Sequence, residues 1–195
     1  MITQREDEDI ATSSQPLYAQ HGPIIQEFGT LRLMPIALSH KARQLSTQLL
    51  NQILADTLVL HSLYKKAHWQ MRGPTFNQLH LLLDKHAGEQ LALIDQLAER
   101  IQGLGGVAVA DLWLATEMTT LERPPSGVET VPAMLSRLLA AHETIITGVR
   151  TAIEETVFNG DSTTNDLLVG DVLRTHEQQV WFLSEHLVDT PTVRV

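Results

Sequence analysis

The residues best suited to chemistry lie in one stretch near the middle of the chain. His80 and Asp84 are four positions apart, and so are Asp95 and Glu99. At about 100° per residue, four positions along an α-helix return to nearly the same face, so these side chains are predicted to form one polar stripe. Imidazoles and carboxylates are ligands for borderline and hard metal ions, and the stripe therefore suggests a metal site.

His68 adds a candidate ligand from the preceding segment. It stands five residues before Gly73-Pro74, which is expected to end one helix and to begin a short hairpin. Such a hairpin brings His68 level with His80 and Asp84. Acidic residues at helical spacing more often form a solvated helix face, however, and the spacing alone leaves both interpretations open.

The separation of the two acidic pairs restricts what they can bind. Asp84 and Asp95 are eleven residues apart, or about 16 Å along a helix, whereas metal–ligand bonds are only about 2.0–2.2 Å long. One ion cannot span both pairs within a single chain. A second copy packed antiparallel across a two-fold axis would bring the pairs together and create two equivalent sites. The spacing thus predicts a dimer as well as a metal.

A different kind of metal centre can be excluded. Di-iron centres inside a single four-helix bundle use Glu-x-x-His on two of the helices, and none of the nine histidines has a glutamate three positions before it. The chain also has no cysteine, so any metal must be held by His, Asp or Glu.

Long amphipathic helices are the elements that must position these residues. Apolar residues recur at helical spacing over about 39–72, 75–103, 129–158 and 163–187. Ser39 suits the N-cap of the first helix. The connection 107–128 is long and has room for a short helix at about 111–116. Four helices with one long crossover, between the second and the third, predict an all-α, ferritin-like four-helix bundle.

One domain accounts for most of the chain. We assign residues 1–36 to an extended, mostly polar and acidic N-terminal tail, 37–188 to the bundle, and 189–195 to a short C-terminal tail. No apolar stretch is long enough to span a membrane, and the acidic start does not resemble a secretory signal, so we expect a cytoplasmic protein. The net charge of −9 argues against a phosphate-binding surface. It is compatible with attracting cations, although ordinary solubility is the simpler explanation.

The segment 65–106 strongly resembles the Dps family of mini-ferritins. The signature of that family has a His-Trp pair, then Gly and Phe, a second His twelve residues after the first, and an Asp four residues later. An Asp-x-x-x-Glu pair follows, before Arg and a Gly-rich end. The corresponding residues here are His68-Trp69, Gly73, Phe76, His80, Asp84, Asp95, Glu99, Arg100 and Gly105-Gly106. The overall resemblance covers about residues 38–187.

The resemblance implies an activity and an assembly. Dps proteins form hollow homododecamers with tetrahedral symmetry and oxidise iron(II) at their two-fold interfaces. Hydrogen peroxide is usually preferred to O2, and the product is stored as ferric mineral, which protects against oxidative damage. By this resemblance His68, His80 and Asp84 would come from one subunit, and Asp95 and Glu99 from its partner. Trp69 would lie beside this ferroxidase site and take up stray oxidising equivalents.

Further roles follow from the same resemblance. Family members admit iron through acidic pores lined from the region that joins the last two helices, where Asp161 and Asp166 are the pore candidates. Asp166 is equally well explained as an early-helix residue that complements the helix dipole. Some relatives add histidines to the site and admit zinc, so His176 is an additional candidate ligand. A structural role is the simpler explanation for His176 and for His86.

The tails depart from the family pattern. Family members that bind DNA usually carry mobile tails rich in Lys and Arg. Here Glu6-Asp7-Glu8-Asp9 follows a single Arg5, and the C-terminal tail contains one arginine. Because acidic tails repel phosphate, we predict no appreciable DNA binding at physiological salt.

Overall fold

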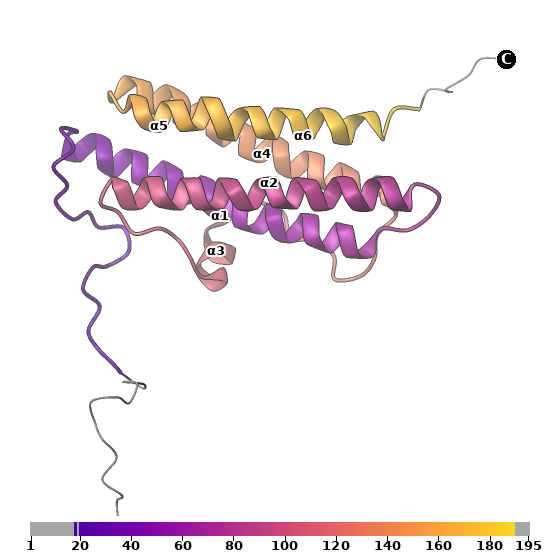
Figure 1. Cartoon of the computed structure of the whole chain (residues 1–195), viewed down its shortest axis with the longest axis horizontal. Helices are drawn as coiled ribbons and strands as arrows, with labels where there is room; N and C mark the ends of the chain where they lie inside the picture. The colour runs from indigo at the N-terminus through magenta and orange to yellow at the C-terminus, as the bar shows by residue number, and fades with distance from the viewer. Residues whose placement is uncertain (1–17, 19, 190–195) are drawn as a thin grey trace, which may run out of the picture.

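Two long helices form the half of the molecule that carries the predicted ligands (Figure 1). In this computed structural model, α1 spans His40–Gln70 and begins at the N-cap Ser39, whose hydroxyl accepts a hydrogen bond from the Ala42 N–H at 3.1 Å. α2, Phe76–Gly103, follows after a turn in which Gly73 has a φ of +93°, a left-handed conformation that favours glycine. The prediction of these two helices and of the turn between them is confirmed.

The other half consists of α4 and a last helix in three parts. α4 spans Val131–Phe158 and packs against α1 and α6. The last helix comprises α5, Ser162–Leu167, the π-helix η1, Leu168–Leu173, and α6, Arg174–Glu185. The sequence predicted one uninterrupted α-helix here. The difference is the π-helix, a form that is rare and often occurs next to functional positions.

A buried carboxylate of α1 helps to fix the crossover between α2 and α4. Its short helix α3, Leu112–Met118, begins at the N-cap Asp111 and lies close to the predicted range. After α3, the carboxylate of Asp56 accepts hydrogen bonds from the Thr119 hydroxyl and the Thr120 N–H, both at 2.7 Å. The described residues contain no strand, so the all-α class is confirmed.

The segment before α1 is held against the end of α2. The structure describes Tyr18 and residues 20–189, so the acidic cluster of the predicted tail and residues 190–195 lie outside the described part. The Arg32 N–H donates a hydrogen bond to the carbonyl oxygen of Gly105 at 2.9 Å. The Arg43 guanidinium donates to the carbonyl oxygens of Arg32 and Leu104 at 3.0 and 2.9 Å. The later part of the predicted tail is therefore anchored to the bundle.

Apolar side chains from all four helices fill the core. Burial of each large apolar side chain contributes about 1.5–3 kcal/mol to folding. Several polar side chains interrupt this core, all of them at most 1 % exposed: Tyr64, His86, Gln90, His142, His176 and Gln179. None of the described helices is both long enough and apolar enough to cross a lipid bilayer.

Candidate metal centre

His68 and His80 are held face to face across the hairpin of α1 and α2. Their rings are stacked, with centroids 3.8 Å apart and an interplanar angle of 17°. The Nδ1 atom of His68 lies 2.8 Å from the carbonyl oxygen of His80, and the Nδ1 atom of His80 lies 3.0 Å from the carbonyl oxygen of His68. A carbonyl oxygen only accepts hydrogen bonds, so both Nδ1 atoms carry the hydrogen.

This reciprocal pairing leaves the Nε2 atom of each ring with a lone pair. Hydrogen bonds from the other ring nitrogen to a backbone carbonyl are the usual way in which proteins fix the tautomer and orientation of metal-binding histidines. Phe76 also stacks against His80, with ring centroids 5.0 Å apart. The two imidazoles are therefore oriented before any metal binds.

Asp84 lies next to the histidine pair and carries an ion pair with Lys65. Its Oδ1 atom is 3.9 Å from Nε2 of His68 and 2.5 Å from Nζ of Lys65. The hydrogen bond from Lys65 holds the pKa of the Asp84 carboxyl below its ordinary value. Asp84 is thus anionic at neutral pH, and Lys65 occupies the side of the carboxylate where a cation would bind.

Asp95 and Glu99 lie further along α2 and are exposed. Among the described residues, neither carboxylate has a hydrogen bond or an ion pair. α2 is unbroken between Asp84 and Asp95, so the two positions are separated by about 16 Å along its axis. The apolar side chain of Leu91, which lies between these two positions on α2, is also exposed, at 55 %.

A single chain does not complete the site. In the described part of the chain, no group of three or more His, Asp or Glu side chains is arranged to hold a metal ion. His68, His80 and Asp84 approach one another, whereas Asp95 and Glu99 face outward elsewhere on α2. The prediction that both sets cannot meet within one subunit agrees with this geometry.

Comparison with known proteins identifies the family. The ferritin-like domain family matches residues 47–193. The "DNA protection during starvation protein" of Agrobacterium fabrum is 30% identical over 150 residues, which cover 77% of this chain and 92% of that protein. The structure of DpsC from Streptomyces coelicolor is 62% identical, with a TM-score of 0.87, and the match covers 88% of this chain and 100% of that chain. This chain belongs to the Dps family of ferritin-like proteins.

A further relative, an uncharacterised protein encoded in the bpoA2 5′ region of Kitasatospora aureofaciens, is 60% identical over 149 residues. That match covers 76% of this chain and 99% of the relative. Membership of the Dps family supports iron storage as the general function of the chain and iron as the metal that it binds. The particular ligands and the oxidation chemistry are treated below as proposals.

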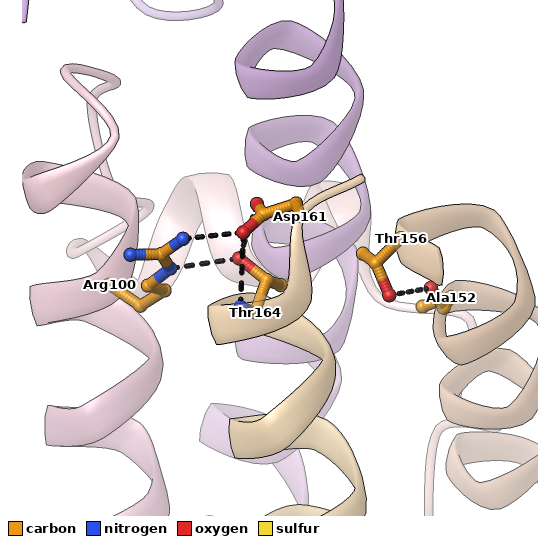
Figure 2. A network of polar contacts seen from close by, with 5 residues as sticks. All are labelled: Arg100, Ala152, Thr156, Asp161 and Thr164. Carbon is orange, nitrogen blue, oxygen red and sulfur yellow. Dashed lines mark hydrogen bonds and ion pairs between the residues drawn. The ribbon is translucent and has the colours of Figure 1, made fainter. Parts of the chain in front are cut away.

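In this Dps chain, Asp161 is a structural residue and does not fit the predicted pore role (Figure 2). Its side chain is 2 % exposed and accepts hydrogen bonds from the Arg100 guanidinium at 2.6 Å and from the Thr164 hydroxyl at 2.6 Å. Burial opposes the charge of Asp161, but the bonds from Thr164 and the charge of Arg100 together lower the pKa of its carboxyl. A carboxylate enclosed in this way does not face a pore. Asp166 is exposed and lies beyond the first turn of α5, so the helix-dipole interpretation loses its basis.

His176 is not supported as an additional ligand, because it lies in the bundle core. Its Nδ1 atom is 2.8 Å from Nδ1 of His142, and Nε2 of His142 is 2.5 Å from the hydroxyl of Tyr64. His86 is also buried and packs edge-on against Tyr64, with ring centroids 5.4 Å apart. Burial lowers the pKa of His86 and of His176 to about 4 in each case, so both are neutral at pH 7.

Two features of the site were missed by the sequence analysis. Lys65 pairs with Asp84, although the two residues are nineteen positions apart and no motif joins them. Tyr64 and His142 form a buried polar contact between α1 and α4. The sequence did contain one indication for Tyr64. It precedes His68 by four positions, or one helical turn, so the two side chains lie on neighbouring parts of the same helix face.

Proposed function

We propose that this Dps chain is a ferroxidase that oxidises iron(II), preferentially with hydrogen peroxide, at sites shared between two subunits. His68, His80 and Asp84 bind iron from one subunit, and Asp95 and Glu99 bind it from the partner. The ferric product is stored as mineral inside a hollow homododecamer with tetrahedral symmetry, in the cytoplasm. The observation that carries this proposal is the pair of reciprocal contacts that orients His68 and His80 beside Asp84. Two exposed carboxylates, with no ion pair in the described part of the chain, lie further along the same helix.

The ligand types suit the proposed reaction. Neutral imidazoles bind iron(II), whereas the carboxylates of Asp84, Asp95 and Glu99 favour the higher charge of iron(III). Few protein ligands for each iron leave positions at which peroxide or O2 reacts. Trp69 lies next to His68 in the sequence and is 73 % exposed, and its proposed role is to take up stray oxidising equivalents, as the family resemblance implies. Zinc(II) accepts the same ligands, so we expect it to compete with iron(II).

Entry of iron requires a separate path. With Asp161 engaged by Arg100, we retain Asp166 as the pore residue, because its carboxylate is exposed near the start of the last helix. Acidic side chains at a shell opening raise the local concentration of cations.

Complementation between two inactive variants tests the shared site. His68→Ala and Asp95→Ala are each expected to lower the initial rate of ferric absorbance at least about tenfold, in line with the loss of metal-site groups. In a mixed interface, one site loses both residues and the other retains all of them. Random co-assembly therefore restores about a quarter of the sites, because half the two-fold interfaces are mixed and each contains one intact site.

The matched control is a mixture of His68→Ala with Asp84→Ala, whose substitutions fall on the same half of the site. This mixture leaves one defect in every site and is expected to restore no activity. Equal recovery in both mixtures, or no recovery in the first, would contradict the shared site. The mass of the assembly in solution tests the dodecamer separately.

A second candidate function is protection of DNA by direct binding, which the name of the Agrobacterium fabrum relative suggests. The net charge of −9 and the acidic N-terminal sequence disfavour it here. We propose that this chain protects by consuming peroxide and iron.

A further inference from the structure

One turn before His68, the core of the bundle contains a chain of polar groups that the proposed ligand set does not use. It runs from the hydroxyl of Tyr64 on α1 to Nε2 of His142 on α4, at 2.5 Å, and from Nδ1 of His142 to Nδ1 of His176 on α6, at 2.8 Å. All three side chains are fully buried. We call these three residues the Tyr64 relay.

The contacts of the Tyr64 relay allow a direction that suits proton transfer from the phenol. Within the described residues, the hydroxyl of Tyr64 has no partner other than His142, so its hydrogen finds an acceptor when the phenol donates to Nε2 of His142. His142 then carries its hydrogen on Nδ1 and donates to Nδ1 of His176, whose own hydrogen lies on Nε2. That Nε2 atom is buried and has no hydrogen-bond partner in the described part of the chain. The relay thus starts at a phenolic proton and ends at an unpaired imidazole.

The surroundings of Tyr64 bear on what this arrangement can do. Burial, followed by the nearby charge of Glu89, raises the pKa of the Tyr64 phenol well above its ordinary value, so the residue is a neutral phenol. Removing an electron from a phenol makes its proton strongly acidic, and an isolated buried cation is costly. A base within hydrogen-bonding distance that takes the proton as the electron leaves keeps the tyrosyl radical neutral and carries the positive charge on its own ring until the proton returns.

We propose that Tyr64 is a redox-active residue that donates one electron to the iron site while its phenolic proton passes to Nε2 of His142. The proposal rests on the ferroxidase function argued above. When a site holds a single iron(II), peroxide takes one electron from it and yields iron(III), hydroxide and a hydroxyl-radical equivalent. An electron from Tyr64 converts that radical to a second hydroxide, the O–H bond of Tyr64 breaks, and a neutral tyrosyl radical remains.

The next iron(II) restores the residue. It supplies one electron to the tyrosyl radical, and the proton returns from His142 to the phenolic oxygen. The sum is two iron(II) oxidised and two hydroxide ions formed for each peroxide, with Tyr64 regenerated. Burial lowers the pKa of His142 well below its ordinary value, so a proton held there returns readily once the phenolate is formed.

Trp69, which follows the proposed ligand His68 in the sequence, is less suited to this step. Loss of an electron makes an indole cationic, and the Lys65 ammonium lies 5.8 Å from the centroid of the Trp69 ring. A positive charge at that distance opposes the formation of another. Trp69 is also exposed, whereas Tyr64 is enclosed by the bundle and keeps its radical away from solvent.

The composition of the chain allows a clean test. Tyr18 and Tyr64 are its two tyrosines, so in the full-length Tyr18→Phe variant every tyrosyl signal comes from Tyr64. The assembled variant is loaded with about one iron(II) per site, mixed with a limited amount of hydrogen peroxide and frozen rapidly for electron paramagnetic resonance. We expect a tyrosyl radical whose spectrum narrows when the protein contains ring-deuterated tyrosine. The signal is thus assigned to Tyr64 without substituting Tyr64 itself.

Two variants then test the residue and its base. Tyr64→Phe is expected to abolish the signal and to increase spin-trapped hydroxyl radical severalfold, with ferric absorbance still forming. His142→Gln, which retains a polar side chain but removes the base, is expected to lower the radical yield severalfold, whereas His61→Gln on the outer part of α1 leaves it unchanged. Sizing confirms that each variant assembles.

The outcomes separate this inference from the proposed function. If ferric absorbance does not form in the unsubstituted protein, the ferroxidase proposal fails. If it forms normally but no tyrosyl radical appears at one iron per site, or if the radical persists in Tyr64→Phe, the role of Tyr64 is wrong while the ferroxidase proposal stands.

Discussion

At the scale of single residues, Lys65 determines how readily Asp84 is available to a metal. Its ammonium lies 2.5 Å from the carboxylate oxygen that also approaches His68. A cation that binds Asp84 must displace this ammonium or share the carboxylate with it. Because both side chains are partly exposed, their attraction is modest and screened by solvent. We therefore expect Lys65 to tune the affinity of the proposed site without blocking it.

Replacing Lys65 with glutamine is expected to strengthen iron(II) binding. The gain should be roughly twofold to fivefold, the range expected when an exposed ion pair no longer competes. An anaerobic titration with iron(II) measures the dissociation constant. Lys85→Gln is the matched control, since Lys85 pairs with Glu89 at 2.6 Å and not with a proposed ligand. Unchanged or weaker binding in Lys65→Gln would contradict competition for Asp84.

The positions of the proposed ligands on the helices were predictable because they depend on local geometry. Four of them lie on one straight helix, where spacing fixes the face of each side chain, and His68 is joined to them by a short turn. The contacts of Lys65 and the Tyr64 relay depend on how helices distant in sequence pack together. Asp161 shows the same limit, since the arginine that encloses it comes from α2, sixty-one residues earlier.

At the scale of elements, the last helix contains a feature that its sequence pattern hides. Apolar residues continue at helical spacing through η1, so the sequence predicts an ordinary α-helix. The π-helix adds a residue to one turn and changes the register of everything after it. His176 and Gln179, which follow on α6, thereby face the core beside α4 and α2.

The contact between the N-terminal segment and the end of α2 depends on Gly105. Its φ is +87°, and an added Cβ would lie 2.7 Å from both the carbonyl oxygen of Arg32 and Cγ of Met34. Gly105→Ala is therefore expected to destabilise the protein by about 1–3 kcal/mol, through backbone strain and displacement of the segment. The shift in the urea midpoint of unfolding measures this loss.

Gly103→Ala provides the control for this prediction, because Gly103 is the last residue of α2 and an added Cβ would meet open space. Alanine is the better helix former, so this variant should be neutral or stabilised by up to about 1 kcal/mol. A loss of stability equal to that of Gly105→Ala would show that the close approach of the segment is unimportant.

At the scale of the whole molecule, buried histidines make the stability of the bundle depend on pH. His142 and His176 are neutral in the folded state, and burial lowers the pKa of His176 to about 4. In the unfolded chain both would titrate near their ordinary pKa of 6.5. The unfolded state therefore binds more protons below pH 6.5, and stability falls as the pH decreases from 6.5 toward 4.

His176→Gln should flatten this dependence. Removing one such histidine lowers the slope of the free energy of unfolding against pH by up to about 1.4 kcal/mol for each pH unit. The effect is measured between pH 6.5 and 5, because most carboxylates titrate below that range. Urea unfolding at several pH values measures the slope. His186→Gln, which replaces an exposed histidine, should leave the slope unchanged. A parallel pH dependence in His176→Gln and the unsubstituted protein would rule out this contribution.

The charge of the chain bears on whether the proposed assembly contacts DNA. Each chain carries a net charge of −9, and the acidic cluster Glu6-Asp7-Glu8-Asp9 begins at the sixth residue. Binding to DNA depends on lysines and arginines that neutralise phosphates and release counterions, so repeated acidic tails weaken it. We expect no band shift with plasmid at physiological salt.

Replacing Glu6, Asp7, Glu8 and Asp9 with lysine should produce a shift that disappears as salt is raised, while ferric absorbance forms at the original rate. A shift by the unsubstituted protein at physiological salt would contradict the separation of iron handling from DNA binding.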